Sequence, residues 1–295
     1  MVINKIDGWL FIDKPIGISS FSVIRKIRKL LNIKKIGHAG TLDPFATGVL
    51  GIAIGEATKS IDYLNDKKEY EFNITFGESK TTEDLEGETI DSTNKIPNKN
   101  EIKNILKYFT GVIDQHPPKY SSVKINGVRS YSLARKDLHF QTKSRKITIY
   151  EIRHIKQLNN FTHKLRVKCS SGTYIRSLGR DIAFRLNSLG YISFLRRTKI
   201  SKIGEKSIIS LDKFSELVHI GNHFKMVLPI ESVLDDIPAV YLNKDNAIRF
   251  RNGQALNIFN LSCKVNSLLV LKEKKVIGLG KVEDGKLVPI RMFNI

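Results

Sequence analysis

The sequence has little cysteine and no long apolar run, and each absence excludes a class of protein. Its two cysteines, Cys169 and Cys263, lie far apart and match no zinc-ligand spacing, so both are expected to be buried thiols rather than a disulfide. No run of about 18 apolar residues could form a membrane-spanning helix. The first residues also lack the apolar core of a signal peptide. We therefore expect a soluble, cytoplasmic protein.

Acidic residues are scarce as well. The chain has 29 Asp and Glu against 49 Lys and Arg, which gives a formal net charge of +20 and a pI near 9.8. The excess is concentrated, because residues 101–200 hold 21 Lys and Arg against 5 Asp and Glu. A generally lysine-rich composition would spread its charge evenly along the chain. The uneven charge favours a polyanion partner and a phosphate-binding surface in this stretch.

The hydrophobic pattern predicts mixed strands and helices with a small β-rich end, and 295 residues at 41% hydrophobic content suffice for two domains. One helix is expected after the N-cap serines Ser19 and Ser20, with an apolar face that starts at Phe21. Residues 77–99 are polar and predicted to be an exposed loop, and Asp284 and Gly285 favour a type I′ turn. Strands are expected at 9–12, 49–54, 70–76, 147–152 with a register shift, 165–169, 268–271 and 276–280, and further helices at 101–109 and 178–186.

Residues 37–48, Gly-His-Ala-Gly-Thr-Leu-Asp-Pro-Phe-Ala-Thr-Gly, place one carboxylate, Asp43, among turn-forming residues. Three glycines permit unusual backbone angles, and Pro44 disfavours helix at Asp43. Without a hydrophobic period, the segment is predicted to be a shaped loop. On the local pattern alone, a plain Asp-Pro turn or helix cap explains Asp43 equally well.

The stretch resembles the signature loop of the TruB family of tRNA pseudouridine synthases, in which the aspartate is the catalytic nucleophile. Its matching residues are His38, Gly40, Leu42, Asp43, Pro44, Ala46 and Gly48. Other blocks resemble the family too: residues 13–20, 55–59, 68–72, 117–127, 169–178 and 194–198. By themselves, Lys14 and Lys59 would be ordinary surface charges, and Tyr70 would be a tyrosine at the edge of the core.

The resemblance implies a role for each of several residues besides Asp43. Arg176 stands in an apolar context where a charge needs a partner, and the family pairs it with Asp43. Tyr174 then lies against the target base, and His38 fills the place that the flipped base leaves. The residues expected to bind the RNA substrate are His38, Tyr70, Tyr174, Arg176 and Leu195, with Leu195 as an apolar wall of the uracil pocket. At Thr81 the family usually has an aspartate, while Thr82 and Asp84 fit its pattern.

The fold implied by the resemblance is α+β, with a mixed, mainly antiparallel sheet in the catalytic domain and a small β-rich, PUA-like C-terminal domain. We expect the catalytic domain at residues 1–230 and the RNA-binding domain at residues 231–295. The implied reaction isomerises the T-loop uridine of tRNA, conventional position 55, to pseudouridine after base flipping. This chemistry requires no redox step, so no cofactor or metal is expected. The implied partner is the T arm of tRNA. We expect no guide RNA and no membrane partner, and we expect the enzyme to be a monomer.

Three alternatives compete with this hypothesis. A non-catalytic tRNA-binding protein would explain the charge, but not the set formed by Asp43, Tyr174 and Arg176. A zinc base deaminase would need a His-x-Glu and a Pro-Cys-x-x-Cys motif, and both are missing. A dyskerin-like, guide-RNA-dependent synthase is the nearest alternative, but the compact N-terminus and short tail favour the stand-alone bacterial type.

Overall fold

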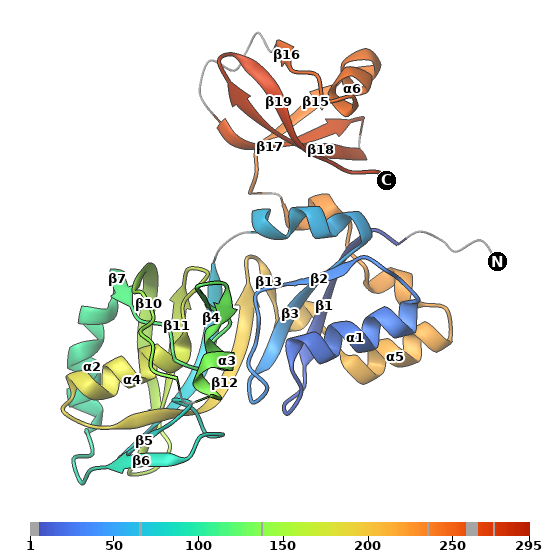
Figure 1. The fold of residues 1–295 in the computed structure, drawn as a ribbon. Helices are drawn as coiled ribbons and strands as arrows, with labels where there is room; N and C mark the ends of the chain where they lie inside the picture. Colours follow the sequence, from blue (N-terminus) through green and yellow to red (C-terminus); the bar gives the residue numbers. More distant parts are fainter. Residues whose placement is uncertain (1–5, 65–66, 137, 235, 258–264, 274) are drawn as a thin grey trace.

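Two main β-sheets organise the chain in a computed structural model (Figure 1). Within the described residues the larger sheet has ten strands and the smaller has five. No helix in the described part of the chain is long and apolar enough to cross a membrane. The structure describes residues 6–64, 67–136, 138–234, 236–257, 265–273 and 275–295.

The larger sheet is mixed and mainly antiparallel. Its main strands in spatial order are β14 (Ile209–Ser210), β1 (Gly8–Lys14), β3 (Thr47–Ile54), β12 (Gly190–Ile200), β4 (Lys68–Phe76), β11 (Thr162–Cys169), β10 (Arg145–Gln157) and β7 (Gly111–Gln115). In addition, β2 (Ile36–Ala39) pairs with β3, and β13 (Ile203–Gly204) pairs with β12. Among the described strands of this sheet, only the pairs β1–β14 and β3–β12 are parallel. The predicted fold class is confirmed.

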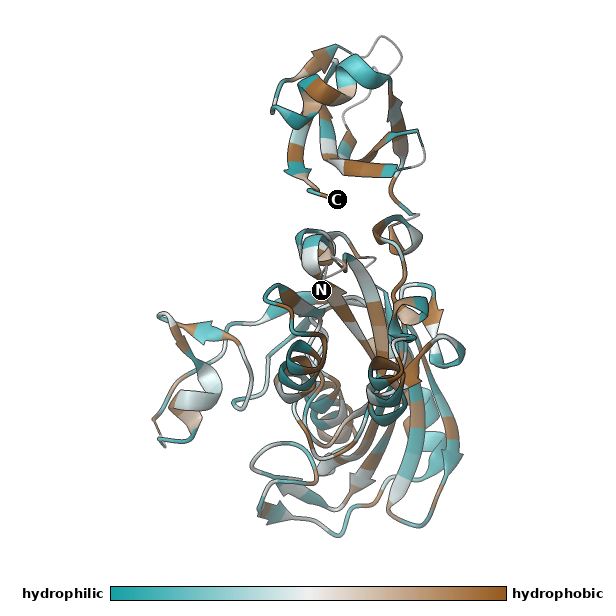
Figure 2. Cartoon of the chain, turned by 90° about the vertical axis from the view of Figure 1, so that its right-hand side faces the viewer, coloured by the Kyte–Doolittle hydropathy of each residue, from teal (hydrophilic) through white to brown (hydrophobic). Residues whose placement is uncertain are grey.

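Successive side chains along each strand point to opposite faces of the sheet, so the two faces carry different residues. In β1, Leu10 and Ile12 pack into the main hydrophobic core, while Trp9 and Phe11 point to a second core on the other side. The predicted register shift in β10 is present between Ile149 and Glu151. Figure 2 shows hydrophobic segments along the strands and helices of the body, and hydrophilic segments at the protruding loops.

Helices cover one face of this sheet in two groups: α1 (Ser20–Leu31) with α5 (Leu211–His219), and α2 (Lys99–Leu106) with α4 (Ile175–Arg185) (Figure 1). Ser19 caps α1 as predicted, since its Oγ accepts a hydrogen bond from the Ser22 amide at 3.0 Å. The expectation for Phe21 was wrong. Its side chain is 63% exposed, and the buried stripe begins at Val23.

The segment 77–99 differs from the predicted loop, because it contains a short hairpin of β5 (Glu78–Lys80) and β6 (Thr89–Ser92). The hairpin was missed because its strands are short and polar. A second hairpin, β8 (Lys124–Ile125) and β9 (Val128–Arg129), leads into α3 (Ser130–Ala134). The 3₁₀ helices are η1 (Gly55–Tyr63), η2 (Lys107–Phe109), η3 (Glu205–Ser207), η4 (His223–Met226) and η5 (Ile230–Val233).

The smaller sheet follows η5 and forms the C-terminal domain (Figure 1). Its order is β15 (Ala239–Leu242), β17 (Val265–Lys272), β18 (Lys275–Glu283), β19 (Lys286–Met292) and β16 (Leu256–Asn257), with α6 (Lys244–Arg251) packed against it. The predicted hairpin is β17–β18. Asp284 and Gly285 connect β18 to β19 with φ angles of 50° and 69°, as a type I′ turn requires.

Of the two cysteines, Cys169 is a buried thiol in β11, as expected. It belongs to the main core together with Leu165 and Val167 of the same strand. Cys263 lies outside the described residues, so the expectation for it stays a prediction.

The second hydrophobic core joins the two sheets. Trp9 and Phe11 of β1 belong to one cluster with Leu269, Leu279 and Phe293 of the C-terminal domain. Burial of large aromatic side chains such as these contributes strongly to the association of two domains. The cluster also contains Ala57 of η1 and Ile230 and Val233 of η5, so these two 3₁₀ helices take part in joining the C-terminal domain to the larger sheet.

Glu56 adds a polar link at this junction. It is 8% exposed and accepts hydrogen bonds from Lys35 Nζ at 2.9 Å, Lys59 Nζ at 2.6 Å and the Asn294 amide at 2.8 Å. Lys59 Nζ also donates to the Met292 carbonyl at 2.6 Å. Burial alone would raise the pKa of Glu56, but the hydrogen bonds from Asn294, Lys59 and Lys35 lower it from 4.5 to about 2.

Glu56→Gln should therefore remove a pH-dependent part of the stability. Because the pKa of Glu56 is depressed on folding, its contribution is complete above its unfolded pKa of 4.5 and is lost as pH falls toward about 2. Between about pH 6 and about pH 3 this group should account for a loss on the order of 2 kcal/mol in the wild type that the variant does not show. Urea unfolding at both pH values measures the difference, and equal losses in the two proteins would contradict it.

Candidate active site

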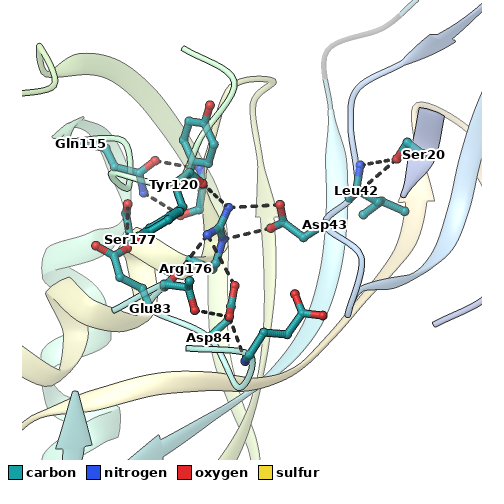
Figure 3. Close-up of polar contacts among 12 residues, drawn as sticks. Ser20, Leu42, Asp43, Glu83, Asp84, Gln115, Tyr120, Arg176 and Ser177 are labelled. Carbon is teal, nitrogen blue, oxygen red and sulfur yellow. Dashed lines mark hydrogen bonds and ion pairs between the residues drawn. The ribbon is translucent and has the colours of Figure 1, made fainter. Parts of the chain in front are cut away.

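The loop that carries Asp43 connects β2 to β3 and is fastened to the start of α1. Ser20 Oγ accepts a hydrogen bond from the Leu42 amide at 2.8 Å and donates to the Leu42 carbonyl at 2.9 Å (Figure 3). Gly48 has a φ of 100°, and a Cβ there would lie 2.2 Å from the Arg197 carbonyl oxygen. The glycine lets β3 approach β12, so the position of Asp43 is set by two neighbouring elements.

Lys14, at the end of β1, also binds this loop. It is completely buried, unlike a surface lysine, and its Nζ donates to the carbonyls of Pro15 at 2.9 Å, Ile18 at 2.7 Å and Pro44 at 3.2 Å. Burial is the main reason that the pKa of Lys14 falls from 10.5 to about 8, although Asp43 and Glu86 act in the opposite direction. The cation therefore ties residues 15–18 to the residue that follows Asp43.

Asp43 and Arg176 form a two-point ion pair (Figure 3). Arg176 Nη2 donates to Asp43 Oδ1 at 3.1 Å, and Nε lies 3.0 Å from Oδ2. The arginine side chain is 6% exposed, whereas the carboxylate remains 31% exposed. Arg176 stands in the first turn of α4, so the expectation drawn from the sequence, an arginine in a mostly apolar strand, was wrong about the element. The pair orients a carboxylate that a substrate can still reach.

Three further groups hold the Arg176 guanidinium in place. Nη1 donates to the Thr82 carbonyl at 3.0 Å, Nη2 donates to the Tyr120 carbonyl at 2.9 Å, and Nη1 lies 3.4 Å from Asp84 Oδ2. Asp84 is 3% exposed, and burial raises its pKa although Thr82 and Arg176 act in the opposite direction. Asp84 was not predicted to belong to the site, although its agreement with the family pattern was a usable signal.

The turn that presents Asp84 is itself fixed by α4. Glu83 has a φ of 62°, a conformation that is uncommon outside glycine, and its carboxylate accepts from Arg180 Nη1 at 2.6 Å. Thr81, the departure from the family pattern, bonds to Glu88 instead: its Oγ1 accepts from the Glu88 amide at 3.1 Å. Thr81 thus stabilises the hairpin loop, and within the described residues its hydrogen bonds join it to Glu88 and not to the Asp43–Arg176 pair.

Tyr70 and Leu195 lie in the main core beside the loop. Tyr70 is 6% exposed and Leu195 is 4% exposed, in the same cluster as Leu42. Burial raises the pKa of Tyr70, and the smaller effect of Arg197 lowers it. Asp43 is close enough to act on this pKa electrostatically. The structure thus places both side chains in the core that contains Leu42, the residue before Asp43, and the roles expected for them stay predictions.

Arg197 was not predicted to have a role, yet it is a central support of the loop. It is fully buried, and it donates to the Val49 carbonyl at 2.7 Å and to the Gly40 carbonyl at 3.1 Å. A weak contact of 3.5 Å joins its Nη1 to the Tyr70 hydroxyl. The strand β12 also contains Arg196, Thr198 and Lys199, so there was no clear signal in the sequence that this arginine is buried and must find acceptors.

Tyr174 and His38 come from two different elements, the start of α4 and β2. The Gln115 side chain holds the Tyr174 backbone at both ends, since Nε2 donates to its carbonyl at 3.0 Å and Oε1 accepts from its amide at 2.8 Å. Burial lowers the pKa of His38, with a smaller contribution from Arg197. His38 is therefore neutral near pH 7.

Some basic residues of the segment 101–200 are paired with acidic side chains. Lys164 lies 2.5 Å from Glu71, and Arg166 also pairs with Glu71, on the sheet face that the helices do not cover. These cations are already neutralised. The expectation of a phosphate-binding surface in this stretch stays a prediction.

The arrangement can perform nucleophilic chemistry, because it holds an oriented and partly exposed carboxylate. The Tyr70 hydroxyl, whose pKa Asp43 influences, is a group that can transfer protons. In the parts of the chain that the structure describes, no group of three or more His, Cys, Asp or Glu side chains could hold a metal ion.

Comparisons with known proteins give consistent results over nearly the whole chain. Residues 28–175 match the family described as TruB family pseudouridylate synthase (N terminal domain), and residues 238–293 match Pseudouridine synthase II TruB, C-terminal. A tRNA pseudouridine synthase B of Rhodospirillum rubrum is 39% identical over 301 residues, covering 99% of this chain and 98% of the relative. The protein of that name from Caulobacter sp. (strain K31) is 37% identical, covering 99% and 97%.

Solved structures share the fold. A chain in the crystal structure of a Cbf5-Nop10-Gar1 complex superposes with a TM-score of 0.75 at 25% identity, covering 97% of this chain and 83% of that chain. A chain in a structure of an H/ACA RNP bound to a substrate RNA gives a TM-score of 0.73 at 23% identity, with 98% and 85% covered.

Proposed function

Because the chain belongs to the TruB family of pseudouridylate synthases, we propose that it isomerises the T-loop uridine of tRNA, conventional position 55, with Asp43 as the nucleophile. The observation that carries the proposal is the two-point ion pair of Asp43 with Arg176, at 3.0 and 3.1 Å, on a carboxylate that stays 31% exposed. A turn-capping aspartate would not need a buried arginine held by three other groups.

The reaction balances without any external reagent. The bond between N1 of uracil and C1′ of the ribose breaks, the base rotates, and a bond from C5 to C1′ forms. The C5 proton is lost and N1 gains a proton, so the product is an isomer. Attack of Asp43 on C1′ or on C6 of the base satisfies this balance equally.

The neighbouring residues bind the flipped base and transfer protons. Tyr174 stacks on the flipped base and Leu195 forms the apolar wall of its pocket. Tyr70 keeps its proton because burial raises its pKa, so its hydroxyl is available for proton transfer. Neutral His38 occupies the gap that the flipped base leaves in the RNA stack.

The substrate on this proposal is tRNA recognised through its T arm, by a monomer that uses no guide RNA. Support comes from the names of the relatives at 37–39% identity, which are tRNA pseudouridine synthases. The C-terminal domain, proposed at residues 231–295, adds RNA contacts next to the catalytic domain at residues 1–230.

Incubating the pure protein with an unmodified tRNA transcript, a chelator and no guide RNA tests the proposal. Pseudouridine mapped at the T-loop position, and none in a transcript with cytidine there, is the expected result. Product at another uridine would retain the synthase activity and overturn the position. Binding without any product would favour the non-catalytic alternative, and product only with an added guide RNA would favour the guide-dependent type.

A further inference from the structure

Arg145, at the start of β10, has a charge that the catalytic arrangement does not use. Its Nε and Nη2 are buried and have no hydrogen-bond partner, and within the described residues no ion pair is recorded for it. Buried donors without an acceptor are rare in folded proteins, and such a donor is available to an ion or another ligand that reaches it. Because the guanidinium makes no hydrogen bond, turning toward an anion would cost it none.

The guanidinium is stacked on Tyr174. Its central carbon lies 4.5 Å from the centroid of the Tyr174 ring. The backbone of Tyr174 is fixed by Gln115, which is also the β7 residue paired with Arg145. Stacking leaves the edge of a guanidinium available for bidentate hydrogen bonds, so Arg145 can face an anion while it supports the ring.

Beside Arg145, two glycines open the surface next to the Asp43 loop. Gly172 has a φ of 81°, and a Cβ there would lie 3.4 Å from Arg145 Nη1. A Cβ at Gly40 would lie 3.3 Å from Lys68 Nζ. Lys68 Nζ also donates to Ser171 Oγ.

These residues border a cavity of about 420 Å³. It is lined by Gly40, Lys68, Ser171 and Gly172, among others, and Asp62 is its acidic lining residue. The cavity thus joins the loop of the nucleophile to the turn before α4, with Lys68 in its wall and Arg145 behind Gly172.

We infer that Arg145, together with Lys68, binds a backbone phosphate of the RNA directly beside the nucleotide that enters the active site. This rests on the proposed function, because it needs an RNA substrate at Asp43. A phosphate matches the planar donor fork of arginine and the point charge of lysine. On this proposal, the phosphate lies next to a nucleotide stacked on Tyr174, the ring against which Arg145 is also stacked. The contact would fix the backbone where it turns.

Salt-dependent binding of a T-arm hairpin RNA tests the inference, in an Asp43→Asn background that prevents turnover. Arg145→Gln should weaken binding about tenfold at low salt and flatten the log–log salt slope by about one unit. Arg145→Lys should keep most of the slope, because the charge remains. The matched control is Arg153→Gln: Arg153 belongs to the same strand, is 55% exposed and lies 3.5 Å from Glu151.

Two further hairpin RNAs locate the contact. One carries an uncharged methylphosphonate on the 5′ side of the target uridine, and the other carries it on the 3′ side. At one of the two positions the substitution should weaken binding to the Arg145 protein and have no further effect on Arg145→Gln. A slope unchanged by Arg145→Gln, or additive losses at both positions, would overturn the inference. It would also be overturned if Arg145→Gln, made in the protein that keeps Asp43, lowered turnover without weakening RNA binding. Wild-type pseudouridine formation is measured separately, so binding that depends on Arg145 without product would refute the proposed function and not this contact.

Discussion

Asp43→Asn is expected to abolish pseudouridine formation while leaving tRNA affinity nearly unchanged. Asparagine has almost the same size and can still accept a hydrogen bond from Arg176 Nη2, which lies 3.1 Å from Asp43 Oδ1. It has no nucleophilic carboxylate, so the loss in single-turnover rate should be at least about 10⁴-fold. Rapid-quench product assays and filter binding on the same preparation measure both quantities.

The matched control is Asp181→Asn. Asp181 is also bound to an arginine, with Arg180 Nη2 at 2.8 Å, and its side chain is 35% exposed, but it lies on α4 without a contact to Arg176 or Asp43 among the recorded ion pairs. Its rate should stay close to that of the wild type. Substantial turnover by Asp43→Asn that mass spectrometry shows to be free of deamidation would refute Asp43 as the nucleophile.

Local patterns predicted the elements that hold the site, because their signals are strong. The buried strand β1, the capped helix α1 and the alternation in β4 follow from periodicity and capping alone. The contact between Asp43 and Arg176 could not follow from spacing, since 133 positions separate them. It was expected only from the resemblance to a family.

The features of the site that the sequence did not reveal are mainly buried charged side chains. Lys14 and Arg197 are both fully buried and bind backbone carbonyls, whereas their residue types favour the surface. Asp84 sits on a polar turn that looks like an exposed loop until the fold places it against Arg176. Phe21 shows the opposite case, because an apolar residue at the first turn of α1 stays exposed. Tertiary contacts, and not local preference, decide such positions.

Arg176→Lys is expected to lower the single-turnover rate on the order of 10²-fold, the second large effect at this site. Arg176 contacts Asp43 at two points and also reaches Asp84 and two carbonyls, which a single ammonium group cannot reproduce. The carboxylate would keep its charge but lose its fixed orientation. Affinity for tRNA should change little if the pair acts on the chemical step. Rapid-quench rates and filter binding together distinguish an effect on that step from an effect on tRNA binding.

Arg180→Lys is the matched control, because Arg180 stands one turn further along α4 and bonds to Glu83 and Asp181 rather than to Asp43. Its rate should stay within about threefold of the wild type, because lysine keeps the positive charge that faces Glu83 and Asp181. Asp84→Asn supplies the second arm: it should slow the wild type, and slow Arg176→Lys much less, because both changes disturb one guanidinium. Independent, additive losses would mean that Asp84 acts on the reaction without Arg176. A rate near that of the wild type for folded Arg176→Lys would show that charge alone, and not the two-point geometry, prepares Asp43 for attack.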